Sequence, residues 1–169
     1  YYVIAAAEAS SNLARFDGIR YGRRAADCGT PEEVFVRSRT EGFGPEVQRR
    51  ILLGTLLLSG ENRERYYFRA RQVRARVVRT FDGLLGQYDL LVSPVSPTTA
   101  WRLGEKADPV RMYRSDIHTA PVSLAGLPAL SLPFGRDENG LPCAVQLIGP
   151  GCAERLIYRT AYALEEGRA

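Results

Sequence analysis

The chain of 169 residues has a composition typical of a globular domain, with 45% hydrophobic and 25% charged residues. No apolar run approaches the roughly 20 residues that a bilayer-spanning helix needs, which argues against a membrane protein. The formal net charge of +4 comes almost wholly from arginine, with Lys106 as the only lysine. An excess of this size, without a nucleic-acid-binding motif, is more typical of a solvated surface than of an RNA site.

The ends and the cysteines bear on cellular context. The first residues, Tyr-Tyr-Val-Ile, include neither an initiator methionine nor a charged segment before an apolar one. We therefore expect a piece of a longer protein, without a signal peptide. Three cysteines without a CxxC pair, and a single histidine, His118, are too few for a zinc cluster. Reduced thiols, a cytoplasmic location and no bound metal are the expected state.

The first third of the chain predicts three helices. An alanine-rich helix over residues 3–15 ends before the turn pair Asp17-Gly18. A helix over residues 31–40 begins with Thr30 as the cap, Pro31 in the first turn and Glu33 closing a capping box. A third helix runs from residue 45 to residue 58, and we expect its apolar stretch, residues 51–58, to be buried.

Two features of these helices have both a structural and a functional interpretation. Residues 8–12, Glu-Ala-Ser-Ser-Asn, suit either close helix packing or the wall of a site. Arg49 and Arg50 precede the apolar stretch and are either surface residues or anion receptors. Because neighbouring residues point about 100° apart on a helix, the two arginines need not share a role. From the sequence alone, a surface position is the simpler interpretation for each.

The middle of the chain predicts a long helix and a hydroxyl-rich loop. Residues 62–86 place an apolar stripe on one side and arginines on the rest, as in a helix that covers a sheet. A short buried strand follows at residues 89–92. The loop after it either lines a pocket or caps turns through its hydroxyls, and neither of its serines lies in a nucleophile elbow. These hydroxyl residues are Ser93, Ser96, Thr98 and Thr99.

The last third predicts a helix, a hairpin and a closing helix. A helical segment with Met112, Tyr113, Asp116 and Ile117 runs to a break at residues 125–126 and places Asp116 at a pocket rim. Strands at 129–133 and 144–148 form a hairpin around an Asn-Gly turn. A helix over residues 153–166 buries Leu156, Ala163 and Leu164. The whole predicts a single α/β piece over residues 1–169, with a mixed sheet covered by helices.

Several short motifs together resemble one family. Besides the initial Tyr1-Tyr2, they are AEASSNLARFDG at 7–18, RYG at 20–22, EGFG at 41–44, RRILLGT at 49–55, SPTTA at 96–100 and LAGLP at 124–128. These motifs resemble the A subunits of glutamyl-tRNA(Gln) amidotransferases, a family of amidase-signature enzymes. The likeness spans essentially the whole chain and corresponds to the C-terminal part of such a subunit.

The resemblance implies an activity that this chain shares with other segments and subunits. Such enzymes hydrolyse glutamine and pass the ammonia to a partner subunit, which amidates Glu-tRNA(Gln) with ATP and magnesium. The family's catalytic lysine and two serines lie in a glycine- and serine-rich segment that is absent here, and Lys106 does not match that lysine. The resemblance therefore implies no catalytic residue and no cofactor in this chain, inactivity of the piece alone, and partner subunits B and C with tRNA bound through the complex.

The resemblance also implies residues that recognise the substrate. In the family an arginine binds the α-carboxylate of glutamine, an aspartate binds its α-ammonium group, and a tyrosine lines the pocket near the reacting amide. These positions match Arg50, Asp116 and Tyr1, with Arg49 and Tyr2 as neighbouring alternatives. Because a zwitterionic head group requires one fixed cation and one fixed anion, we expect Arg50 and Asp116 to face each other across a cleft.

Two other functions are compatible with the residues. One is a general amidase of the same fold with a different amide substrate, for which the charged pair would be unnecessary. The other is a non-catalytic domain that docks partner subunits or tRNA through its arginine-rich helix face.

Overall fold

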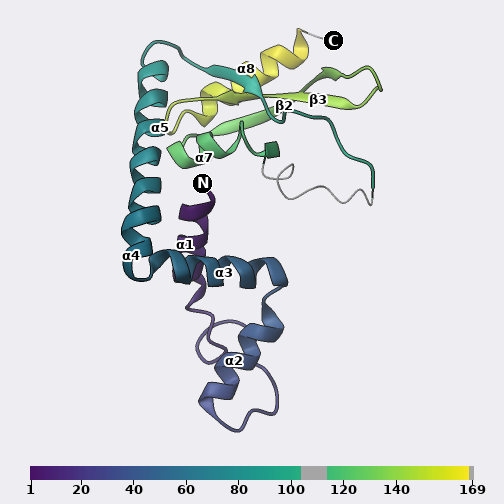
Figure 1. Ribbon diagram of the computed structural model, residues 1–169. Helices are drawn as coiled ribbons and strands as arrows, with labels where there is room; N and C mark the ends of the chain where they lie inside the picture. The colour runs from purple at the N-terminus through teal and green to yellow at the C-terminus, as the bar shows by residue number, and fades with distance from the viewer. Residues whose placement is uncertain (104–113, 168–169) are drawn as a thin grey trace. The chain divides into compact units, whose positions relative to one another are not determined.

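A computed structural model describes residues 1–103 and 114–167 of the chain. The chain divides into two compact units, Tyr1–Val73 (the first unit) and Arg74–Ala169 (the second unit). Helix α5 (Arg69–Leu85) runs through the boundary between them (Figure 1). The prediction of one α/β piece therefore stays a prediction. None of the described helices combines the length and the apolar character that crossing a bilayer requires.

Helices make up the first unit. Before α5 they are α1 (Tyr2–Leu13), α2 (Pro31–Gly42), α3 (Pro45–Leu58), the single turn α4 (Gly60–Asn62) and the π-helix η1 (Arg63–Phe68). The three helices predicted at the start of the chain are confirmed, and α3 has the predicted bounds.

The start of α2 has the predicted capping residues. The hydroxyl of Thr30 accepts a hydrogen bond from the backbone N–H of Glu33 (3.2 Å), and Pro31 occupies the first turn. The Glu33 carboxylate accepts a bond from the N–H of Gly29 (2.7 Å), one residue before the cap. Two backbone donors that the helix itself cannot pair are thereby satisfied.

Helices α1 and α3 lie in close contact at Gly54 (Figure 1). A Cβ atom at this position would collide with the carbonyl oxygen of Ala6 and come within 2.6 Å of Ser10 Cβ. Ser10 and Thr55 form a hydrogen bond across the same contact (3.0 Å). For Ser10, close packing is therefore the correct one of the two interpretations.

The expectation that residues 51–58 are buried is wrong for most of that stretch. Gly54 and Leu57 are buried against α1, whereas Leu52 is 73% exposed and Leu53 and Leu56 are also exposed. A helix turns one face toward a single neighbour, so a continuous apolar run cannot be covered by α1 alone.

The continuous helix predicted over residues 62–86 is also wrong. The π-helical η1 interrupts it, and π-turns change the phase between the apolar residues before and after them. Helix α5 itself buries no residue, and Val73 is 56% exposed. The spacing correctly indicates an apolar stripe but not a neighbour that covers it.

The second unit contains a sheet of three described strands. The strands are β1 (Leu91–Pro94), β2 (Ala129–Arg136) and β3 (Pro142–Ile148), and the other helices of the unit are α7 (Ala120–Ala125) and α8 (Glu154–Glu166). The order is β1-β3-β2, and both described pairings are antiparallel. The predicted α/β class and the predicted hairpin are confirmed, and each hairpin strand is longer than expected.

The core of the second unit lies between the sheet and α8 (Figure 1). It consists of Leu132, Leu147, Ile157 and Ala161, with Leu90, Leu130 and Val145 packed against it. The predicted buried face of α8 is wrong, because Leu156, Ala163 and Leu164 are exposed. Ile157 and Ala161 lie one turn apart and face the sheet, which rotates the buried face away from Leu156.

Candidate functional site

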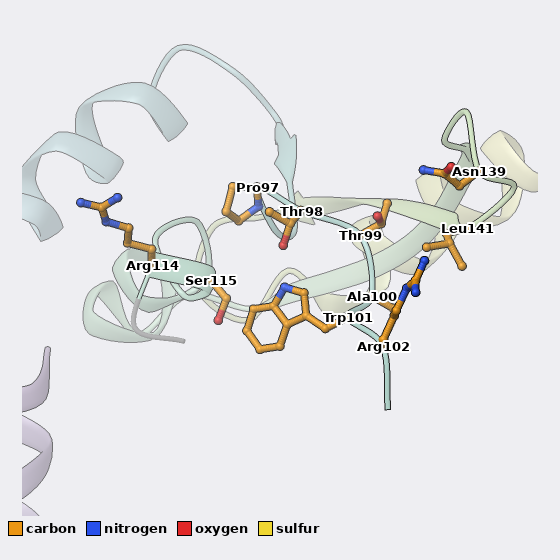
Figure 2. A pocket seen from close by; sticks show the side chains of 10 residues that line it. All are labelled: Pro97, Thr98, Thr99, Ala100, Trp101, Arg102, Arg114, Ser115, Asn139 and Leu141. Atoms are coloured by element: carbon orange, nitrogen blue, oxygen red, sulfur yellow. The ribbon is translucent and has the colours of Figure 1, made fainter. Parts of the chain in front are cut away.

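A cavity of about 950 Å³ lies in the second unit beside the loop that follows β1. Thr98 and Thr99 line it, so the prediction that this loop forms part of a pocket is confirmed for two of its four hydroxyl residues. Figure 2 shows the Trp101 ring between Ser115 on one side and Arg102 on the other. The volume lies in the range of small-molecule sites.

The loop is anchored to the hairpin turn by Thr99. Its hydroxyl donates to Oδ2 of Asp137 (2.9 Å), while Oδ1 accepts bonds from the backbone N–H groups of Leu141 (2.8 Å) and Asn139 (2.9 Å). The Leu141 bond, followed by those from Thr99 and Asn139, lowers the pKa of Asp137 below its ordinary value. Ser96 caps a turn by accepting from the N–H of Thr98 (3.3 Å).

The cavity lining favours a polar ligand that carries negative charge. Two guanidinium groups, from Arg102 and Arg114, accompany the indole of Trp101 and the hydroxyls of Thr98 and Ser115. Guanidinium groups bind carboxylates and phosphates through several parallel N–H donors. Across the described ranges 1–103 and 114–167, no cluster of His, Cys, Asp or Glu is arranged to hold a metal ion.

Asp116 lies in a turn just before α7 rather than in a helix, as had been expected. Its backbone carbonyl accepts a bond from the N–H of Ala120 (2.8 Å), and its carboxylate accepts a long bond from the Ser115 hydroxyl (3.5 Å). The side chain is half-buried, and Ser115 lines the cavity. Met112 and Tyr113, predicted in the same segment, lie outside the described residues.

Gln146 is a buried polar residue that the sequence reasoning missed. Its side-chain amide donates to the Ser93 hydroxyl (2.9 Å), to the carbonyl of Pro94 (3.3 Å) and to the carbonyl of His118 (2.9 Å). The signal was present in the sequence, since Gln146 is the single polar side chain in the apolar run Ala-Val-Gln-Leu-Ile at 144–148. A polar group in a buried strand needs hydrogen-bond partners.

Arg49 and Arg50 pair with the same carboxylate, one turn earlier on α3. Arg49 lies 2.6 Å from Oε2 of Glu46, and Nε of Arg50 donates to Oε1 of Glu46 (3.0 Å). The Arg50 hydrogen bond and the nearby Arg49 charge lower the pKa of Glu46. The Arg50 side chain is 42% exposed and that of Arg49 is 67% exposed, so Arg50 is the more enclosed. A guanidinium has five N–H donors, so a bond to Glu46 is compatible with carboxylate binding.

Tyr1 precedes α1 and packs edge-on against the ring of Tyr2, with 5.1 Å between ring centroids. Its side chain is 45% exposed. Tyr1 and Arg50 belong to the first unit and Asp116 belongs to the second. The predicted cleft between Arg50 and Asp116 therefore stays a prediction.

Comparisons with known proteins place these residues in context. A family model described as Amidase matches residues 1–157. The chain is 56% identical over 167 residues to the A subunit of the glutamyl-tRNA(Gln) amidotransferase of Symbiobacterium thermophilum, covering 98% of this chain and 34% of that protein. It is 49% identical over 166 residues to the protein of the same name from Halothermothrix orenii, covering 98% and 35%.

Solved structures give the same picture. The crystal structure of the A subunit of a glutamyl-tRNA(Gln) amidotransferase from Thermotoga maritima is 39% identical, with a TM-score of 0.60, over 96% of this chain and 33% of that one. A component of an s-triazine catabolic enzyme complex, 24% identical with a TM-score of 0.69, over 98% of this chain and 33% of that one, shows the fold alone. The chain spans about a third of the length of these relatives.

Proposed function

Because this chain belongs to the amidase family, we propose that it is the glutamine-binding part of the glutaminase subunit of a glutamyl-tRNA(Gln) amidotransferase. The observation that carries the proposal is identity of 49% and 56% to two relatives of that name, over 98% of this chain. In this proposal the chain forms the C-terminal part of the subunit, and the catalytic lysine and serines come from another segment. The chain alone is then inactive.

The recognition chemistry follows from the two ends of glutamine. The guanidinium of Arg50 binds the α-carboxylate, and the carboxylate of Asp116 binds the α-ammonium group. The Glu46 bond to Nε supports this role for Arg50, because it restrains the guanidinium from its own helix. Tyr1 lines the pocket near the side-chain amide. The two charges orient that amide toward the nucleophile, and a misplacement of about 1 Å can cost roughly a hundredfold in rate.

The remaining parts of the proposal concern the assembly. The ammonia passes to a partner subunit, which uses ATP and magnesium to amidate Glu-tRNA(Gln). Partner subunits B and C and the tRNA complete the complex, which acts in the cytoplasm during translation. The names of the relatives support this assembly.

Replacing Asp116 tests the ammonium site. In the full-length protein assembled with its partners, Asp116→Ala should raise KM for glutamine by about 30-fold or more, since a charge-assisted bond is lost. Thermal unfolding should stay near wild type. Ammonia release measured against glutamine concentration gives KM, and Asp82→Ala, an exposed aspartate of α5, is the matched control. A KM that stays at the wild-type value would refute the assignment.

A pair of lysine substitutions separates the two neighbouring arginines. Arg50→Lys should lose most glutaminase activity, because an ammonium group cannot reproduce a two-pronged guanidinium contact. Arg49→Lys should keep it, since the more exposed side chain pairs only with Glu46 in the described contacts. The reverse pattern would assign the carboxylate site to Arg49.

A second candidate function is favoured by the surface of α5. Arg69, Arg76 and Arg79 lie on one side of this helix and are exposed, and no ion pair between described residues involves them. A domain that binds tRNA directly would use such a face. Replacing all three by Gln should then weaken tRNA binding and reduce its salt dependence, whereas glutaminase activity without tRNA would be unchanged.

A further inference from the structure

Gln146 lies in the central strand β3, with its side chain on the face of the sheet that is turned away from α8. Its neighbours Val145 and Leu147 pack with the core beneath α8, and successive residues of a strand point to opposite faces. Gln146 is only 4% exposed. Burial of an amide is unfavourable unless its hydrogen bonds are made inside the protein.

The amide of Gln146 connects two segments that are distant in the sequence. One is the end of β1, through the Ser93 hydroxyl (2.9 Å) and the Pro94 carbonyl (3.3 Å). The other is the turn before α7, through the His118 carbonyl (2.9 Å). Carbonyl oxygens can only accept, so it is the NH₂ group of the amide that must face them. Its two protons serve three acceptors, with the longest bond shared.

The bond to His118 restrains the turn that carries Asp116. The carbonyl of Asp116 accepts from the N–H of Ala120 (2.8 Å), which holds the turn to the start of α7. Gln146 holds the same turn two residues after Asp116, and from the sheet rather than from the helix. The backbone of Asp116 is thereby attached to two different elements.

We infer that Gln146 is a positioning residue, which sets the place of the Asp116 carboxylate relative to the hydroxyl-rich loop after β1. The inference rests on the proposed role of Asp116 in binding the ammonium group of glutamine. An amide is suited to this task because it supplies two N–H donors at the end of a two-carbon stem. A carboxylate in its place would turn acceptor against acceptor, and an apolar side chain would leave both segments without the bond.

Two substitutions remove the connection while keeping the size of the side chain. Gln146→Met fills the same space with an unbranched apolar chain, and Gln146→Glu keeps the shape but lacks the NH₂ donors. In the full-length protein with its partners, each should raise KM for glutamine by about ten- to a hundredfold and leave kcat within about twofold. Gln87→Met, at an exposed glutamine of the same unit, is the matched control and should change neither.

A substrate analogue separates positioning of Asp116 from a general loss of structure. Glutaramic acid has the amide and the carboxylate of glutamine but no α-ammonium group, so Asp116 has nothing to bind. Its inhibition constant against glutamine hydrolysis should therefore be nearly the same in Gln146→Met and in wild type. A parallel rise of KM for glutamine and of the inhibition constant would overturn the inference, as would failure of both variants to fold.

The outcome also separates this inference from the proposed function. If Asp116→Ala raises KM for glutamine and Gln146→Met does not, the positioning role is wrong and the ammonium site stands. If neither substitution raises KM, the assignment of Asp116 itself fails. A rise in both, with the constant for glutaramic acid unchanged, supports both.

Discussion

The first unit packs helix against helix, whereas the second packs a helix against an antiparallel sheet. In the first unit the close contact depends on an absent side chain, since Gly54 lets α3 approach the backbone of α1 at Ala6. In the second it depends on side chains that are present, with Leu147 fully buried and Gln146 joining residues 28 and 53 positions away. Substitutions that disturb one kind of contact should therefore leave the other intact.

The same difference separates the proposed substrate residues. Arg50 is oriented by Glu46, one turn earlier on its own helix. Asp116 lies in a turn whose place depends on β3 and α7. The carboxylate-binding half of the proposed site thus depends on local helix geometry, and the ammonium-binding half depends on long-range contacts.

The largest effect is expected from Leu147→Ala. Removing a fully buried leucine from the core of the second unit should lower the free energy of unfolding by about 3–4 kcal/mol, through lost burial and the cavity left behind. Denaturant unfolding measures the change, and Leu103→Ala, at an exposed leucine, should stay within about 0.5 kcal/mol. Hydrogen exchange should accelerate in β2 and β3 but not in α1; equal acceleration in both units would contradict the comparison.

Gly54→Ala should have the next largest effect. The added Cβ would meet the backbone of Ala6, which cannot move aside as a flexible side chain can. We expect a loss of about 2 kcal/mol despite the better helix propensity of alanine. Gly83→Ala in α5 is the matched control, because a Cβ there meets nothing within 4 Å. That change should stabilise the protein by about 0.5–1 kcal/mol, and equal effects at both positions would rule out the close contact.

The smallest effect concerns two exposed aspartates, one in each unit. Backbone N–H bonds lower the pKa of Asp17, chiefly from Ile19 and Arg20, and that of Asp137, chiefly from Leu141, below their ordinary 3.8. The native state therefore favours the ionised carboxylate, so this stabilisation is complete above pH 3.8 and is lost as pH falls through the lowered pKa.

Asparagine substitutions test that pH dependence in both units. Asp17→Asn and Asp137→Asn should each weaken the fall of the unfolding temperature between about pH 5 and about pH 2, without changing it at neutral pH by the same mechanism. Because the two turns use the same kind of bond, the two variants should behave alike. A pH profile unchanged in one of them would show that the turns differ.

Features that depend on neighbouring residues followed from the amino-acid sequence. The start of α2 at Thr30 and Pro31, the bounds of α3, the hairpin turn with Asn139 and Gly140, and the end of α7 at Gly126 are local choices of capping and turn residues. Such signals act over a few residues and do not depend on the rest of the fold. The family motifs were equally readable, and the match to the Amidase model over residues 1–157 confirms them.

Features that depend on distant partners came only from the tertiary structure. The buried face of α8 follows the sheet rather than the leucines of the helix, and α5 has an apolar stripe but no buried residue. The link from Thr99 to Asp137 and the three bonds of Gln146 join segments that are 28 to 53 residues apart. Periodicity shows that a residue is apolar or polar at a given face, but which group it meets there is decided by the packing of the whole unit.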